Sequence, residues 1–186
     1  EEAKGCGPHT ISVPRIRKAD DIDPSKFENG IDDKTFCKIV SLIRIAVPYT
    51  GMIISTRESQ SVREKVLSLG VSQISGGSRT SVGGYTVEER IDDTSQFDVS
   101  DTRTLDEVLN WLMKLNYVPS FCTACYRLGR TGDRFMELLK SGQISNCCHP
   151  NALMTLNEYL EDYSLPKTKQ IGKKLIQSEL LKTPNL

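Results

Sequence analysis

The chain of 186 residues has neither an excess of one charge nor a long apolar run. Lys plus Arg and Asp plus Glu both total 24, so the chain lacks the positive field that holds nucleic acids. No apolar stretch approaches the roughly 18 residues that a membrane span requires. We therefore expect neither nucleic acid nor a membrane among its partners.

Nucleotide-binding and export motifs are missing as well. The sequence has no P-loop and no G-x-G-x-x-G after a strand, so it offers no phosphate-binding loop of its own. Its first residues, Glu1 to Lys4, lack both an initiator Met and the basic-then-apolar order of a secretory signal. We expect a cytoplasmic protein that starts after its native N-terminus.

Apolar periodicity predicts an α/β fold for the first hundred residues. Strands are predicted over residues 9–13, 51–55 and 71–75. Helices are predicted between them, the first running to Val47 from a cap at Asp32 or Asp33, and the second over 58–69. Short apolar strands joined by helices are typical of a parallel sheet with right-handed crossovers. Three strands alone leave open edges, so we expect part of a larger sheet or barrel.

The second half of the chain is predicted to be mostly helical. A polar connection rich in Gly and Ser covers residues 78–101, and Thr104 and Glu107 then form a capping box. Further helices are predicted to start at caps on Thr131 and Asn151, and a last one to cover residues 168–181. We therefore expect a domain boundary between residues 100 and 101.

The strongest local signal is a group of cysteines. Cys122 and Cys125 form a C-x-x-C pair, and Cys148 follows Cys125 after 22 intervening residues, directly after Cys147 and before His149. In a reduced compartment such clustering favours metal binding over disulfides. Two thiolates can contact one ion from a single turn, and a third from a distant loop completes the site.

Two kinds of metal site fit this spacing. A structural zinc would use Cys122, Cys125 and Cys148 with either Cys147 or His149 as the fourth ligand. A 4Fe-4S cluster held by the three cysteines would leave one iron open to an outside ligand. Cys147 is redundant for either site, and three thiolates are the number that leaves one iron of a 4Fe-4S cluster open. We therefore favour the cluster.

Polar residues at the ends of two strands suggest a second site. Arg57 follows the middle strand, at the edge where parallel α/β sheets carry their reactive groups. Its guanidinium is suited to bind a substrate carboxylate through paired hydrogen bonds. Ser55 and Ser75 end neighbouring strands at the same level and would complete that site. The alternative is that Arg57 pairs with Glu58 or caps the sheet edge.

Several motifs together resemble the aromatic amino acid lyases of the radical S-adenosylmethionine (SAM) superfamily. The segments Gly7-Pro8-His9-Thr10-Ile11-Ser12-Val13-Pro14-Arg15, Ser55-Thr56-Arg57-Glu58-Ser59, Gln73-Ile74-Ser75 and Gly83-Gly84-Tyr85 look like the last strands of their barrel. The region from Phe121 to Asn151 resembles the C-terminal domain of the tyrosine lyases that mature FeFe-hydrogenase. The thiazole-forming tyrosine lyases of thiamine biosynthesis are related over residues 55–58.

The resemblance implies a fold and an activity. Residues 1–100 would be the last three βα units of a parallel βα barrel of the TIM type, and residues 101–186 a helical cluster-binding domain. The lyases it resembles use a 5'-deoxyadenosyl radical from SAM to break the Cα–Cβ bond of tyrosine, which gives p-cresol and dehydroglycine. An auxiliary 4Fe-4S cluster then supports conversion of the small fragment to CO and cyanide.

The resemblance also implies site residues. Cys122, Cys125 and Cys148 would bind the auxiliary cluster. Arg57, helped by Ser55 or Ser75, would hold the tyrosine carboxylate. No residue of the chain is assigned to the bond-breaking step itself.

One motif of these lyases is absent, because no three cysteines have the C-x-x-x-C-x-x-C spacing of the radical cluster. We therefore expect SAM and a second 4Fe-4S cluster to bind mainly to a missing N-terminal part of the barrel, and this piece alone to be inactive. Expected partners are tyrosine, that missing part and other hydrogenase maturation proteins. The alternatives are a zinc-stapled protein-binding module and a radical lyase for another aromatic amino acid.

Overall fold

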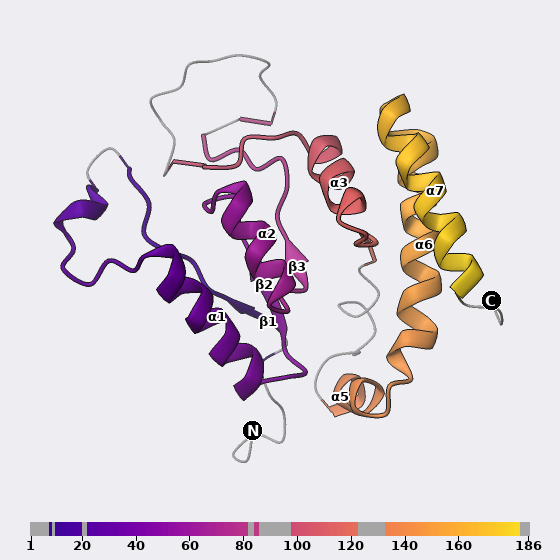
Figure 1. Cartoon of the computed structure of the whole chain (residues 1–186), viewed down its shortest axis with the longest axis horizontal. Helices are drawn as coiled ribbons and strands as arrows, with labels where there is room; N and C mark the ends of the chain where they lie inside the picture. The colour runs from indigo at the N-terminus through magenta and orange to yellow at the C-terminus, as the bar shows by residue number, and fades with distance from the viewer. Residues whose placement is uncertain are drawn as a thin grey trace. The chain divides into compact units, whose positions relative to one another are not determined.

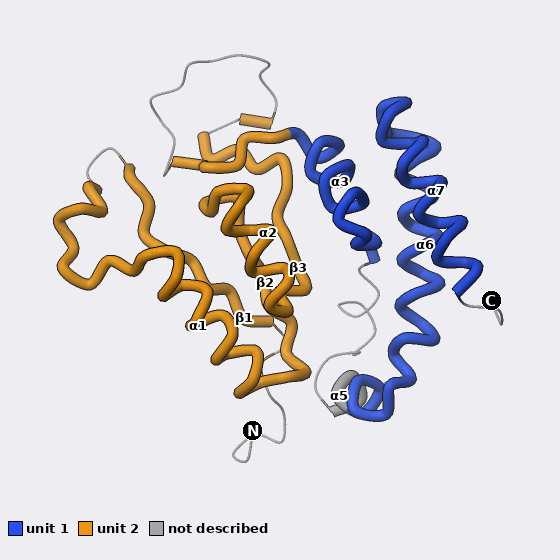
Figure 2. The backbone as a smooth tube through the Cα atoms, viewed as in Figure 1, with its two compact units in different colours: residues 1–7, 104–186 blue, residues 8–103 orange. Residues whose placement is uncertain are grey.

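The computed structural model describes residues 8, 10–19, 22–81, 84–85, 98–122 and 133–182. The chain divides into two compact units, residues 8–103 and residues 104–186 with 1–7 (Figure 2). We call them the sheet unit and the helical unit.

The sheet unit is built on three parallel strands, β1 (Thr10–Ser12), β2 (Gly51–Ile54) and β3 (Gln73–Ile74), in that order across the sheet. The register pairs Ile11 with Met52 and Ile54 with Ile74. The predicted α/β class and parallel order are confirmed. β3 is shorter than expected because the Val71 amide closes the preceding helix through a 3.1 Å hydrogen bond to Val66.

The two long helices of this unit begin at side-chain caps. A short 3-10 turn (η1, Pro24–Lys26) precedes α1 (Asp33–Ala46), which starts where Asp32 accepts a 2.7 Å hydrogen bond from the Thr35 amide. α2 (Gln60–Ser68) starts after Ser59 in the same way, and therefore later than predicted. α1 and α2 pack on each other over one face of the sheet (Figure 1). Phe36, Val40, Met52, Ile54 and Val66 are core residues of the unit.

The amino edge of the sheet is closed by one arginine. Arg44, near the end of α1, donates hydrogen bonds to the carbonyls of Thr50 at 2.8 Å and Gly70 at 2.7 Å. Gly70 has a φ of 101°, in the left-handed region that glycine adopts without strain. Arg44 thereby holds together the ends of both helices and the start of β2, and these contacts serve the structure of this edge.

The helical unit contains α3 (Leu105–Lys114), α5 (Asp133–Lys140), α6 (Ile144–Asp162) and α7 (Pro166–Lys182). The predicted capping box is present, because Thr104 and Glu107 each accept a hydrogen bond from the other's amide. α3, α6 and α7 share one apolar cluster, formed by Leu109, Met113, Leu156, Leu160 and Leu175. α7 approaches α6 so closely at Gly172 that a Cβ there would overlap the buried Leu160 side chain.

The expectation that Asn151 caps a helix is wrong. α6 begins at Ile144 and runs through Pro150, so Asn151 lies inside it. Pro150 lacks an amide hydrogen and costs the helix one backbone bond. The buried residues that follow it, Ala152, Leu153 and Leu156, fix the helix by packing, which outweighs that local signal. The predicted cap at Thr131 lies outside the described residues.

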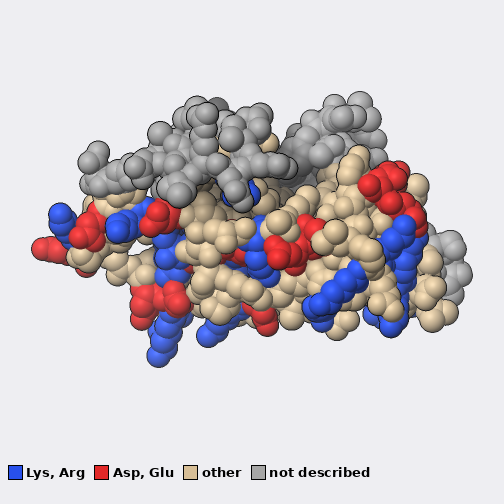
Figure 3. All heavy atoms as spheres, turned by 90° about the horizontal axis from the view of Figure 1, so that it is seen from above, with Lys and Arg blue, Asp and Glu red and all other residues tan. Residues whose placement is uncertain are grey.

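Charges of both signs are interspersed on the face of the molecule shown in Figure 3. In the helical unit, Lys169 and Lys173 both contact Glu161, and their hydrogen bonds lower the pKa of that carboxyl to about 2. No helix among the described residues combines the length and the apolar character needed to cross a membrane.

Candidate functional site

Two of the predicted substrate-binding residues lie together at the carboxyl edge of the sheet. Ser55 directly follows β2 and Ser75 directly follows β3, and the Ser75 amide continues the ladder with a 3.1 Å bond to the Ile54 carbonyl. The half-buried Arg57 lies three residues past the end of β2, and its amide donates to the Ser55 hydroxyl at 3.3 Å. Strand order thus brings Ser55, Ser75 and the Arg57 backbone to one edge.

A buried carboxylate lies beside Arg57 in the sequence. Glu58 is only 1% exposed and accepts hydrogen bonds from Arg15 Nε at 3.0 Å and from Arg17 Nη2 at 2.6 Å. A second bond from Arg15 Nη2 makes that contact bidentate. The Glu58 carboxylate raises the pKa of Arg15 above its ordinary value, although burial opposes the shift. The loop after β1 is therefore tied to the loop after β2.

A second buried ion pair ties β2 to β3. The Arg63 side chain is fully buried on α2 and donates to the Asp101 carboxylate and to the Ser75 carbonyl. The Asp101 amide donates to the Thr56 carbonyl at 3.0 Å, and Arg103 donates to the same carboxylate at 2.6 Å. We call Arg63, Asp101 and Arg103 the β3 clamp.

Burial and charge act in opposite directions in the β3 clamp. Burial lowers the pKa of Arg63, and the negative charge of Asp101 only partly compensates. Burial alone would raise the pKa of Asp101, but hydrogen bonds from Arg103 and the charges of both arginines lower it below its usual value. Arg63 and Asp101 thus form a buried, ionised pair.

These two networks hold Arg57 from both sides. Its neighbours Thr56 and Glu58 are both buried, one fixed through its carbonyl and the other through its carboxylate. Sequence reasoning selected Arg57 but not Arg15, Glu58, Arg63 or Asp101. One signal was available, since Arg15 and Arg17 follow the first strand just as Glu58 follows the second. The role of Asp101 depends on where the end of the connection over residues 78–101 meets the sheet, and no local sequence pattern predicts that position.

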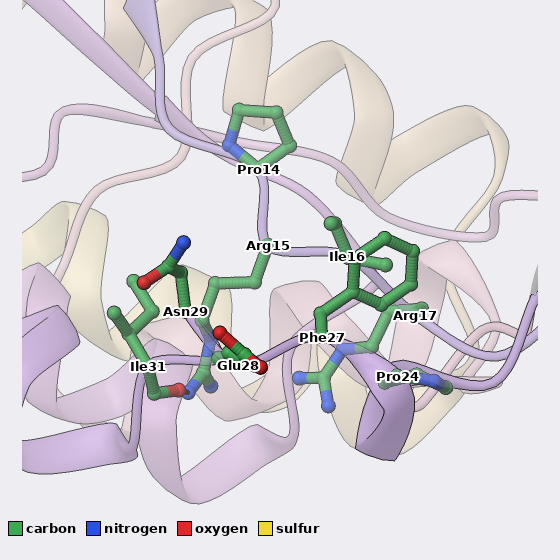
Figure 4. A pocket seen from close by; sticks show the side chains of 10 residues that line it. Pro14, Arg15, Ile16, Arg17, Pro24, Phe27, Glu28, Asn29 and Ile31 are labelled. Carbon is green, nitrogen blue, oxygen red and sulfur yellow. Dashed lines mark hydrogen bonds between the residues drawn. The ribbon is translucent and has the colours of Figure 1, made fainter.

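A cavity of about 460 Å³ lies in the loop between β1 and α1 (Figure 4). Arg15 and Arg17 line it together with the exposed side chains of Ile16 and Phe27. Arg17 Nε is buried and has no hydrogen-bond partner in the described part of the chain. Glu58 and Asp33 already pair with these guanidiniums, so the cavity has no uncompensated positive charge.

The cysteine motif lies in the helical unit. Cys122 is half-buried in the segment that follows α3, and its amide donates to the Ser120 hydroxyl at 3.3 Å. Cys148 is exposed in the second turn of α6, so the expectation that it lies in a loop is wrong. Cys125 lies outside the described residues.

The thiols of Cys122 and Cys148 are groups that can bind a soft metal ion. Thiolates are the ligands that iron–sulfur clusters and zinc prefer. Among the described residues, no three His, Cys, Asp or Glu side chains gather into a metal site. The predicted ligand set includes Cys125, which lies outside the described residues. His149, the other zinc candidate, has its Nε2 3.5 Å from the Glu179 carboxylate.

Similarity to known proteins covers most of the chain. HydG, a maturase of the FeFe-hydrogenase, has a solved structure that matches 99% of this chain and 39% of its own length, with 55% identity and a TM-score of 0.92. HydG from Carboxydothermus hydrogenoformans matches 99% of this chain and 38% of its own, with 39% identity and a TM-score of 0.76. The predicted resemblance is confirmed in sequence and fold.

More distant relatives match a smaller part. The 2-iminoacetate synthase of Escherichia coli (strain K12) is 27% identical over 127 residues, which are 68% of this chain and 32% of the relative. That of Salmonella typhimurium (strain LT2) is 28% identical over 105 residues, 56% of this chain and 26% of the relative. The chain therefore spans about a third or less of these curated relatives. Residues 12–118 match a family profile, and the chain belongs to the Biotin and Thiamin Synthesis associated domain family.

Proposed function

We propose that this chain is the C-terminal part of a cytoplasmic radical SAM tyrosine lyase that acts in FeFe-hydrogenase maturation. The observation that carries the proposal is the 55% identity to HydG over 99% of the chain. The match to 2-iminoacetate synthase supports the wider lyase assignment. Because the chain spans 39% of HydG, the remaining residues of such an enzyme would supply the radical cluster and most SAM contacts.

In this proposal the carboxyl edge of the sheet binds the substrate. Arg57 would hold the tyrosine carboxylate through two hydrogen bonds, and the Ser55 and Ser75 hydroxyls would donate to the same group. The support is that both serines directly follow adjacent strands and that buried networks fix both neighbours of Arg57. A guanidinium held in this way orients the substrate with little loss of entropy on binding.

The cysteines of the helical unit would bind an auxiliary 4Fe-4S cluster through Cys122, Cys125 and Cys148. When bound, a cluster held by three cysteines supplies one open iron, where CO and cyanide formation for the hydrogenase active site would take place. The protein's own contribution would be to fix the three thiolates and to leave the fourth position open. Tyrosine and the other maturation proteins are the partners that this proposal implies.

Anaerobic reconstitution of the chain with ferrous iron and sulfide tests the cluster assignment. We expect a brown protein whose visible absorbance is lost in Cys122→Ala, Cys125→Ala and Cys148→Ala. Cys147→Ala is the matched control and should retain the cluster. A colourless chain that binds one zinc and loses it on His149→Ala would replace the proposal by the zinc-stapled module.

The substrate assignment needs the protein that carries the whole barrel. There, Arg57→Lys should raise the KM for tyrosine, because Lys cannot form the bidentate contact. Arg79→Lys, at an exposed position of the same unit, should leave KM unchanged. Equal KM values in both variants would argue against Arg57, and tighter binding of tryptophan than of tyrosine would favour a different aromatic substrate. The present chain alone should form no p-cresol from tyrosine and SAM.

A further inference from the structure

One helix of the helical unit contacts both described cysteine segments. Cys148 lies on α6 itself. The segment that carries Cys122 contacts the same helix, because the Phe121 amide donates to the Thr155 hydroxyl at 3.4 Å. The Phe121 ring also stacks on Tyr159, with 5.1 Å between centroids and an interplanar angle of 18°. Both contacts involve the residue directly before Cys122.

Helical periodicity places these groups on one face of α6. Thr155 follows Cys148 by seven residues and Tyr159 by eleven, which are roughly two and three turns of an α-helix. Residues at these spacings share one stripe of a helix. Cys147 is one residue removed, and therefore lies roughly 100° around the helix axis from this stripe. The docked segment thus lies along the stripe that carries Cys148.

Tyr159 is itself held firmly. Its hydroxyl donates to Asp106 Oδ1 at 3.3 Å, and Asp106 also accepts bonds from the Leu165 amide at 3.2 Å and the Thr168 hydroxyl at 2.7 Å. Thr168 is buried, and Asn110 donates to it at 3.0 Å. Burial and the Asp106 charge raise the pKa of Tyr159 to about 12, so the ring remains neutral. The network joins α3, α6 and the start of α7.

We propose that Thr155 and Tyr159 are positioning residues for the metal site, which hold Phe121, and through it Cys122, on the α6 face that carries Cys148. This inference rests on the proposed cluster. Two of its three ligands would then be placed by one rigid helix before iron arrives, and only Cys125 would remain to be positioned. Partners that orient metal ligands change metal affinity by about 10- to 100-fold when mutated.

The test compares how quickly the reconstituted full chain loses iron to a chelator. Phe121→Ala should lose iron about 10- to 100-fold faster than wild type, with a changed visible circular dichroism spectrum of the cluster. Phe121 is 40% exposed, so this variant should fold. Tyr159→Leu should have the same effect. Phe121→Tyr and Tyr159→Phe keep the stacked rings, so both variants should lose iron as slowly as wild type.

Met154→Ala is the matched control, because Met154 is exposed on α6 but lies off the stripe. It should behave like wild type in both measurements. Wild-type rates and spectra in Phe121→Ala, with the cluster still lost in Cys122→Ala, would overturn the positioning role alone. A wild-type chain that binds zinc and assembles no cluster would overturn the proposed function and this inference together.

Discussion

The sheet unit buries charged side chains at one edge of its sheet, whereas the helical unit is packed around leucines. Among the described residues, the charged side chains that are buried are Glu58, Arg63 and Asp101, all in the sheet unit. In the described helical unit the buried polar residue is Thr168, whereas the apolar cluster includes Leu156 and Leu160.

In each unit, different residues provide stability and form the candidate site. Buried ion pairs are weak sources of stability, because desolvation offsets most of their attraction. Their position at the carboxyl edge of a parallel sheet, where α/β proteins carry ligands, favours a positioning role. The helical unit has a core of its own and can present exposed cysteines without help from buried charge.

The largest effect should follow from breaking the β3 clamp. Arg63→Met removes the buried guanidinium that bonds both the Asp101 carboxylate and the Ser75 carbonyl. Because the carboxylate stays buried, this variant should lower the free energy of unfolding by about 3–5 kcal/mol. Hydrogen exchange measured by mass spectrometry should show this loss in peptides of the sheet unit. The double variant Arg63→Met, Asp101→Leu should recover part of the stability. A change of less than about 0.5 kcal/mol in Arg63→Met would contradict the comparison.

Removing a buried leucine should affect the helical unit to a similar or slightly smaller degree. Leu156→Ala deletes a fully buried side chain, and should cost about 2–5 kcal/mol through lost burial and a cavity. Trp111, the single tryptophan, lies on α3 and reports this unfolding by fluorescence. Leu165→Ala, at an exposed position, should change the unfolding midpoint very little.

Helix caps should give an effect of intermediate size. Thr104→Ala removes one half of a capping box and should destabilise α3 by about 1 kcal/mol. Ser59→Ala removes a single cap bond of 3.4 Å from α2, so it should cost less. Urea unfolding of both variants measures the difference, and a larger loss in Ser59→Ala would reverse the expected order.

The smallest effects should appear as opposite pH dependences of the two units. The folded pKa of Asp101 is lowered, so its stabilisation is present above the unfolded value of about 3.9 and is lost as the pH falls through the folded one. Tyr159 has a raised pKa, so its contribution is complete below about 10 and is lost as the pH rises toward 12.

Thermal unfolding at a series of pH values checks these signs. Asp101→Asn should weaken the acid dependence seen by far-ultraviolet circular dichroism. Tyr159→Phe should weaken the alkaline dependence seen by Trp111 fluorescence. Unchanged profiles in both variants would show that other groups control the pH response.

Local signals in the sequence were sufficient for most of the fold. Sequence signals predicted α1, β2 and α3, and the structure confirms all three. The two helices were recognised by their caps at Asp32 and Thr104 together with apolar periodicity, and the strand by its apolar run. α6 was mispredicted because Pro150 and Asn151 imitate a helix start, while packing of residues distant in the chain decides where the helix begins.

The candidate site was only partly predictable. Ser55 and Ser75 end predicted strands and Arg57 follows one, so parallel order alone places them at one edge. The partners of Glu58 and Arg63 lie 43 and 38 residues away in the sequence, and no periodicity reports such contacts. The residues of the Phe121–Tyr159 stack are 38 apart in the sequence, and the position of Cys148 on the same helix depends on α6 starting before Asn151.

X-ray absorption at the iron and zinc edges of the anaerobically purified chain tests most directly whether Cys122, Cys125 and Cys148 hold a cluster. We expect iron surrounded by sulfur with further iron beyond it, as in a 4Fe-4S cluster. This signal should disappear in Cys148→Ala and persist in Cys147→Ala. Zinc in one tetrahedral shell of sulfur and nitrogen, with no bound iron, would contradict the assignment.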